Sequence, residues 1–191
     1  MRLGRLLIEA AQAGRRVVRL KSGDPFIFGR GGEEFEALRD AGVACEVIPG
    51  ITAGLGAAAQ FEVPLTFRGE ALRVTFLTAH KAGDLETVDW STLTDAKTTL
   101  VVYMGMTAAP AVQAGLLAAG CSPQTPAGVF ARVTRGDATA LIGTLGELTD
   151  LVEKVGHGPA ILIIGDVVAH AAPPRHQHLT QLASYFQVAA E

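Results

Sequence analysis

The segment best suited to chemistry is a glycine-rich loop, Leu20-Lys-Ser-Gly-Asp-Pro-Phe-Ile-Phe-Gly-Arg-Gly-Gly-Glu-Glu34. Gly23 permits a close backbone approach to a ligand and a positive φ, and Pro25 holds Asp24 away from helical geometry. Backbone groups of such a loop suit a nucleoside, and the Asp24 carboxylate suits hydroxyl or ammonium donors. A plain strand-to-helix turn is the simpler reading of Gly-Asp-Pro alone. The four glycines, the arginine and the two aromatic residues favour a ligand site.

Two shorter loops also follow predicted strands. In Pro49-Gly-Ile-Thr-Ala53 the Thr52 hydroxyl either caps the next helix, its ordinary role, or contacts a ligand. In Tyr103-Met-Gly105 the methionine is ordinarily core filling. Arginines near such loops suit a polyanionic substrate because they bind carboxylates bidentately, although surface salt bridges are their ordinary role. The arginines in question are Arg30, Arg68, Arg132 and Arg135.

Several enzyme classes lack their signatures here. The sequence contains no Gly-x-x-x-x-Gly-Lys-[Ser/Thr] phosphate loop, no Gly-x-Ser-x-Gly elbow, no His-Glu-x-x-His pair and no Gly-x-Gly-x-x-Gly after a strand. His176 and His178 lie in a proline-rich tail, where solvated surface is favoured over metal binding, so no metal site is predicted. Cys45 and Cys121 form no Cys-x-x-Cys pair and no disulfide framework, which favours the cytoplasm.

Composition narrows the class of protein further. The 191 residues are 49% hydrophobic and 18% charged, with a formal net charge of −3. A disordered chain is excluded because it needs low hydrophobicity and high net charge. A nucleic-acid or anionic-membrane binder normally carries a basic surplus, so neither partner is expected. No apolar stretch approaches the ~18 residues of a membrane span, which predicts a globular chain of one domain or two small ones.

Hydrophobic periodicity predicts an α/β fold, because strands alternate with helices as in parallel βα units. The predicted strands are 16–21, 43–48, 73–78, 98–104, 127–133, 138–142 and 160–164. The predicted helices are 33–41, a short one ending at 59, 107–119, and one opened by a capping box at Thr144-Leu-Gly-Glu147. We expect an N-terminal domain over 1–70, a C-terminal domain over 71–171 and a tail over 172–191. The first domain looks incomplete because two strands cannot bury both faces of a parallel sheet.

The run Arg19 to Glu34 closely resembles the signature of uroporphyrinogen-III C-methyltransferases, members of the tetrapyrrole methylase family. The family's order of motifs continues with Pro49-Gly-Ile-Thr-Ala53, Val63-Pro-Leu-Thr66 with Arg68-Gly69, Tyr103-Met-Gly105 and Pro159-Ala-Ile-Leu-Ile-Ile-Gly165. The resemblance implies two α/β domains with a cofactor cleft between them, usually in a homodimer. It implies methyl transfer from S-adenosyl-L-methionine to uroporphyrinogen III. The products would be S-adenosyl-L-homocysteine and precorrin-2, for sirohaem or cobalamin biosynthesis.

The resemblance also implies site residues, position by position. Cofactor contacts fall on Ser22, Gly23, Asp24, Ile27, Thr52, Ala53, Met104, the backbone near Val133, and Ala160. Arg30 and Arg68 are the candidates for binding the substrate carboxylates. The sulfonium methyl is already activated, so the protein mainly aligns the reactants and excludes water. No catalytic base is identified.

The sequence departs from the family pattern in three ways. The family begins with a strand and a Pro-Gly-x-Gly-Asp-type loop, whereas Met1 to Leu7 matches the helix before the signature, so we expect a first domain without its N-terminal segment. Ser22 stands where glycine is usual and should be tolerated at a negative φ, and Phe67 stands where histidine is common. Two alternatives therefore stay open: a methylase of a later corrin intermediate, and a noncatalytic truncated remnant that dimerises through its second domain.

Overall fold

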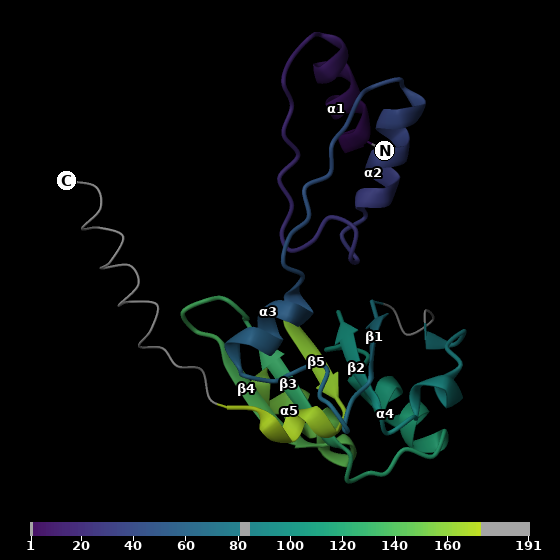
Figure 1. Ribbon diagram of the computed structural model, residues 1–191, viewed down its shortest axis with the longest axis vertical. Coiled ribbons are helices and arrows are strands. Elements are labelled where there is room, and N and C mark those ends of the chain that lie inside the picture. Colours follow the sequence, from purple (N-terminus) through teal and green to yellow (C-terminus); the bar gives the residue numbers. More distant parts are fainter. Residues whose placement is uncertain (1, 81–84, 173–191) are drawn as a thin grey trace, which may run out of the picture. The chain divides into compact units, whose positions relative to one another are not determined.

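The computed structural model describes residues 2–80 and 85–172 of the chain (Figure 1). It divides into two compact units, Met1–Ala53 and Gly54–Glu191. The sequence boundary near residue 70 stays a prediction about domains, whereas the compact units divide earlier because helix α3, Ala53–Gln60, packs on the sheet of the second unit. The predicted tail beyond residue 172, with His176 and His178, lies outside the described residues.

The first unit contains two helices, α1 (Arg2–Gln12) and α2 (Gly31–Asp40), which lie against each other (Figure 1). The helices approach closely at Gly4, where an added Cβ would lie 3.8 Å from the Ala37 Cβ. Leu38 is buried, as the predicted helical pattern requires. Helix α2 was expected from its hydrophobic spacing and α1 from the family resemblance, and both are confirmed.

The two strands predicted for the first unit are wrong. Residues 16–21 and 43–48 carry no strand assignment, and Val18, Leu20 and Ile48 are 80%, 83% and 67% exposed. β-branched residues favour an extended conformation, but strand formation depends on packing and on a paired neighbour. No strand is assigned anywhere in the described part of this unit, so neither segment has such a neighbour.

The second unit is built on a five-stranded sheet in the order β1-β2-β5-β3-β4 (Figure 1). Its strands are β1 (Arg73–Thr78), β2 (Thr98–Tyr103), β3 (Pro126–Ala131), β4 (Thr139–Thr144) and β5 (Ala160–Ile164). Strand β1 is parallel to β2, and β3 is antiparallel to both β4 and β5. Strand β5 is also antiparallel to β2, so β1, β2 and β3 run one way and β4 and β5 the other.

The expectation of uniformly parallel strands is therefore wrong for this sheet, although the α/β class is right. Strands β3 and β4 are joined by residues 132–138, a connection too short for the crossover of a dozen or more residues that parallel neighbours need. The pair consequently forms an antiparallel hairpin. Strand β5 then inserts between β2 and β3 and hydrogen-bonds to both.

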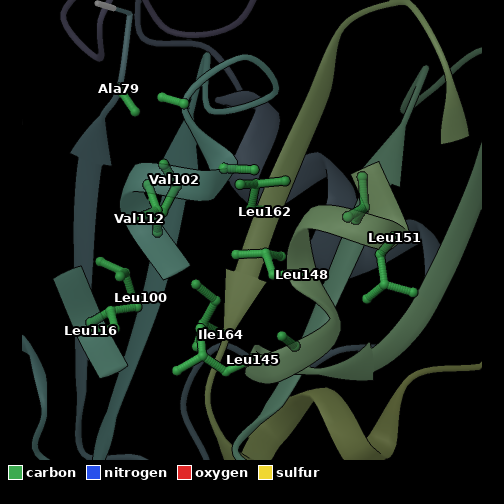
Figure 2. Close-up of a cluster of buried hydrophobic side chains, with 14 of the residues drawn as sticks. Ala79, Leu100, Val102, Val112, Leu116, Leu145, Leu148, Leu151, Leu162 and Ile164 are labelled. Carbon is green, nitrogen blue, oxygen red and sulfur yellow. The ribbon is translucent and has the colours of Figure 1, made fainter. Parts of the chain in front are cut away.

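Both faces of the sheet are covered. Helices α4 (Ala109–Ala118) and α5 (Leu148–Val155) share one face, where Leu100, Val102 and Leu162 meet their apolar side chains (Figure 2). On the opposite face the ring of Phe61 packs on that of Phe130, with centroids 5.3 Å apart. Short 3₁₀ helices complete the unit: η2 (Trp90–Leu93), η3 (Leu145–Glu147) and η4 (Asp166–His170).

The predicted capping box is confirmed at the start of the η3–α5 segment. The Glu147 carboxylate accepts from the Thr144 backbone N–H at 3.0 Å, and the Thr144 side chain accepts from the backbone at residue 147. The box satisfies amides that the first helical turn leaves without partners. It therefore fixes the direction in which the chain leaves β4 and crosses toward β5.

We expect Leu162→Ala to destabilise the protein by about 2–5 kcal/mol, because it opens a cavity where the central strand meets both covering helices. Leu162 is fully buried. The measurement is the free energy of unfolding in urea. Leu72→Ala is the matched control, since Leu72 is 63% exposed and should cost no more than about 0.5 kcal/mol. Equal costs for the two variants would contradict the packing described above.

Candidate functional site

The glycine-rich loop of the first unit is tied at its two ends. Lys21 Nζ lies 2.9 Å from Glu34 Oε2, and Arg19 donates to the other oxygen of the same carboxylate at 3.3 Å. Within the loop Phe26 packs edge-on against Phe35 of α2, with ring centroids 6.2 Å apart. The intervening residues are thus closed into a loop between the end of the extended segment and the first turn of α2.

The contacts with Lys21 and Arg19 affect the pKa of the Glu34 carboxyl. Partial burial alone raises its pKa, but the hydrogen bond and charge of Lys21, together with Arg19, outweigh the burial and lower it. Because the folded pKa lies below the unfolded one, the carboxylate stabilises the fold above the unfolded pKa. That stabilisation is lost as the pH falls through the lowered folded value.

Asp24 connects the glycine-rich loop to the second predicted loop. Its Oδ1 accepts from the Phe26 N–H at 2.8 Å and its Oδ2 from the Gly50 N–H at 3.1 Å. These amides, Gly50 first, lower the pKa of the Asp24 carboxyl. The structure therefore brings Gly23 and Asp24 beside residues 50–53, which include the predicted contacts Thr52 and Ala53.

Ser22 and Ile27 are two further predicted cofactor contacts in the glycine-rich loop. Ser22 is exposed and Ile27 half-buried. Ser22 has no positive φ, which is the condition under which we expect serine to be tolerated in place of the usual glycine. Thr52 is buried at 4% exposure, and it immediately precedes α3.

In the second unit three predicted cofactor contacts lie at one edge of the sheet. Met104 follows the last residue of β2, Val133 lies two residues beyond the end of β3, and Ala160 begins β5. The register pairs Tyr103 with Ile161 and Ala131 with Ala160, so the three positions are neighbours at this edge. Ligands of α/β sheets ordinarily bind at the carboxyl ends of strands, as β2 and β3 are here.

The backbone at this edge adopts left-handed conformations at residues that have side chains. Met104 has a φ of 55°, and Arg132 and Thr134 on either side of Val133 have φ values of 51° and 66°. Such conformations cost of order 1–3 kcal/mol each and gather at functional sites. The Met104 side chain is 43% exposed rather than buried, so its expected role as core filling does not apply.

Helix α3 is hydrogen-bonded to residues of this edge near both of its ends. The Tyr103 hydroxyl accepts from the Gly54 N–H at 2.9 Å, and Gln60 Oε1 accepts from the Thr134 N–H at 2.6 Å. Between these bonds an added Cβ on Gly56 would lie 3.5 Å from both Val133 and Thr134. The helix therefore lies directly against the loop that follows β3.

Sequence reasoning missed Tyr103, Gly54 and Gln60 as positioning residues. The signal was the small-residue composition of α3, AGLGAAAQ, which permits close packing on a sheet. At Gly54 an added Cβ would lie 2.7 Å from the Tyr103 hydroxyl. A side chain at that position would break the contact that anchors the helix.

The two arginines predicted to bind substrate lie in different units. Arg30 is the N-cap of α2 with a φ of 56°, and its exposed side chain donates to Glu33 at 3.2 Å. It borders a hollow of about 920 Å³ between α1, α2 and the glycine-rich loop, and several of the lining residues are charged. Arg68 is exposed on the turn after residue 66. Beside it the His170 imidazole stacks on Phe67 at 4.7 Å and bonds Glu70 at 2.8 Å.

In the described part of the chain no side chains are grouped as a metal site, and no cysteines are paired in a disulfide. Among those residues no three His, Cys, Asp or Glu side chains gather as metal ligands. Cys45 and Cys121 are both free thiols, and burial raises the pKa of the Cys121 thiol. Within the same ranges, none of the helices has the length and apolarity to span a bilayer.

We expect Glu34→Gln to remove a pH-dependent stabilisation of about 0.5–1 kcal/mol at neutral pH. The difference from the wild type should persist above the ordinary glutamate pKa of 4.5 and vanish at lower pH. Urea unfolding across that range measures it. Glu36→Gln is the control on the same helix, because that side chain is 68% exposed and should cost little at any pH. A pH-independent loss in Glu34→Gln would contradict the ion pair.

We expect Gln60→Ala to cost about 1 kcal/mol of stability, because it leaves the Thr134 amide without its acceptor. Gln60→Glu keeps an oxygen at the same reach and should lose much less. The measurements are urea unfolding and amide hydrogen exchange at Thr134, which should accelerate only in the alanine variant. Equal exchange in both variants would show that the bond does not hold the loop.

Comparisons of the sequence and the structure with known proteins point to one protein family. The family model "Tetrapyrrole (Corrin/Porphyrin) Methylases" matches residues 2–149. Siroheme synthase 2 of Yersinia pestis is 49% identical over 163 residues, which cover 85% of this chain and 34% of that protein. Siroheme synthase of Blochmanniella pennsylvanica is 46% identical over 168 residues, 88% of this chain and 35% of that protein. The chain thus spans about a third of the length of these curated relatives.

Solved structures agree with these matches. Uroporphyrin-III C-methyltransferase from Thermus thermophilus, complexed with S-adenyl homocysteine, superposes with a TM-score of 0.74 at 35% identity, covering 88% of this chain and 74% of that one. A cobalt precorrin-4 methyltransferase superposes with a TM-score of 0.78 at 25% identity, covering 87% and 70%. The fold and its expected resemblance are confirmed: this chain belongs to the tetrapyrrole methylase family.

Proposed function

We propose that this chain carries out S-adenosyl-L-methionine-dependent C-methylation of uroporphyrinogen III to precorrin-2, in sirohaem or cobalamin biosynthesis. The observation that carries the proposal is the gathering of Met104, Val133 and Ala160 at one sheet edge, together with the contact between the loops at Gly23 and Gly50. The family's cofactor positions thus fall into two groups, one in each unit.

The residues present fit an adenosyl cofactor. Positive φ at Gly23 and Met104 turns the backbone so that its amide and carbonyl groups can face a ligand. The cofactor would supply a methyl group already activated by the sulfonium charge, and the S-adenyl homocysteine bound to the Thermus relative is the neutral thioether left when that methyl group has been transferred. The loops bind and orient the cofactor. Arg30 and Arg68 bind substrate carboxylates through their guanidinium groups.

Several finer features belong to the same proposal. We place the chain in the cytoplasm, which its cysteine usage favours, and in a homodimer, which the family resemblance implies. Methylation of a later corrin intermediate is the second candidate, favoured by the superposition on a cobalt precorrin-4 methyltransferase. The mass of the product distinguishes the two, because two methyl groups added to uroporphyrinogen III support the first. A noncatalytic remnant would bind the cofactor weakly and turn over no substrate.

The test combines cofactor binding and turnover in a matched pair of glycine variants. Gly23 has a φ of 68° in the glycine-rich loop, and Gly14 has a φ of 76° after α1, with nothing within 4 Å of an added Cβ. Gly23→Ala and Gly14→Ala should therefore share a similar backbone strain. We expect only Gly23→Ala to weaken S-adenosylhomocysteine binding, by about tenfold, which corresponds to about 1.4 kcal/mol.

The measurements are titration calorimetry with S-adenosylhomocysteine and mass spectrometry of uroporphyrinogen III incubated with S-adenosylmethionine. The proposal is supported if the wild-type protein binds S-adenosylhomocysteine and adds two methyl groups to uroporphyrinogen III. A wild-type protein that neither binds S-adenosylhomocysteine nor methylates uroporphyrinogen III would contradict the proposal. Equal loss of affinity in both glycine variants would place the cofactor elsewhere.

A further inference from the structure

Asp24 uses both carboxylate oxygens on backbone amides of two different loops. Oδ1 accepts from Phe26, two residues later in its own loop, and Oδ2 accepts from Gly50 in a loop 26 residues away. Phe26 and Gly50 are not adjacent in the chain, so one carboxylate sets the distance between the loops. Charge-assisted hydrogen bonds of this kind are about twice as strong as neutral ones.

The loops also meet at Gly50, which leaves no room for a side chain. An added Cβ on Gly50 would lie 2.2 Å from the Gly23 carbonyl oxygen. An added Cβ on Gly23 would lie 3.7 Å from the Ile51 carbonyl oxygen and from the Thr52 Cα. The backbone of the second loop therefore lies directly against Gly23, and the carboxylate of the neighbouring Asp24 accepts from Gly50 of the same loop.

We infer that Asp24 is a positioning residue, whose carboxylate ties the Gly23 and Gly50 loops into one backbone surface for the cofactor. This rests on the proposed function, and it differs from the direct cofactor contact that the family resemblance implies for Asp24. The ligand is held by loop backbone and by the Thr52 region, while Asp24 keeps these groups in register. The carboxylate remains ionised because the amides stabilise its charged form.

A clamp and a direct contact predict different behaviour before any ligand is added. Thr52 and Ala53 follow Gly50 by two and three residues, so a clamp on Gly50 also restrains them. Loss of a clamp loosens these residues in the ligand-free protein. Loss of a direct ligand contact leaves them unchanged until the cofactor binds.

The experiment compares Asp24→Asn with Asp40→Asn, a matched change at the exposed end of α2 in the same unit. An asparagine places an amide donor against one of the two backbone donors and so breaks one bond of the pair. In ligand-free protein we expect amide exchange at residues 50–53 to accelerate about tenfold or more in Asp24→Asn alone. Exchange in α1 and α2 should stay unchanged, which shows that the unit containing Asp24 remains folded.

Affinity for two probes completes the test. S-adenosylhomocysteine and 5′-methylthioadenosine share the nucleoside, but only the first carries the amino-acid part. The clamp predicts that Asp24→Asn weakens both by the same factor, about ten- to a hundredfold. Unchanged exchange at residues 50–53 overturns the inference, whether affinity falls or not. If the wild-type chain binds neither probe, the proposed function fails, and the exchange result alone still decides the clamp.

Discussion

Strand β5 lies between β2 and β3 and runs antiparallel to both, and this ladder controls where the candidate site of the second unit forms. Because both neighbours oppose β5, β2 and β3 run parallel and end at the same edge. The start of β5 lies there as well, because Ala160 pairs with Ala131 of β3 and Ile161 pairs with Tyr103 of β2. A slip of one residue in either register would exchange the two faces of a strand whose side chains are buried on both. The register is therefore strongly specified, and it fixes the positions of Met104, Val133 and Ala160 relative to one another.

The edge residues depend on this rigid support. Left-handed φ values at Met104, Arg132 and Thr134 are unfavourable for residues with side chains. They persist because the strands before them are fixed by a core with both faces covered. Tyr103 and Gln60 add the polar contacts that hold α3 over the same edge. Strain at the site is thus balanced by packing elsewhere in the unit.

The first unit is organised by a different kind of interaction. Its glycine-rich loop is held by Lys21 with Glu34 and by Asp24 with Gly50, all of them charge-assisted contacts. The extended segments beside the loop leave Val18 and Leu20 largely exposed. Polar ties and glycine contacts therefore position the loops of this unit, whereas apolar packing positions the edge in the other.

Much of the molecule follows from local sequence signals. Periodicity located every strand of the second unit to within two residues at most ends, and the capping box at Thr144 marked the turn into η3 and α5. The motif run from Arg19 to Glu34 indicated the family that the comparisons show. These features succeed because they depend on residues close together in the chain, such as Thr144 and Glu147.

Only the tertiary structure decided the pairing. Residues 16–21 and 43–48 have strand-like composition but no strand assignment, and β5 takes an antiparallel place that periodicity does not encode. The roles of Asp24 and Gln60 also emerged only from contacts 26 and 74 residues apart in the chain. The sequence by itself determined which segments are helical, extended or looped, together with the family. The fold decided which of them meet, because hydrogen bonds between distant segments depend on partners that no local pattern specifies.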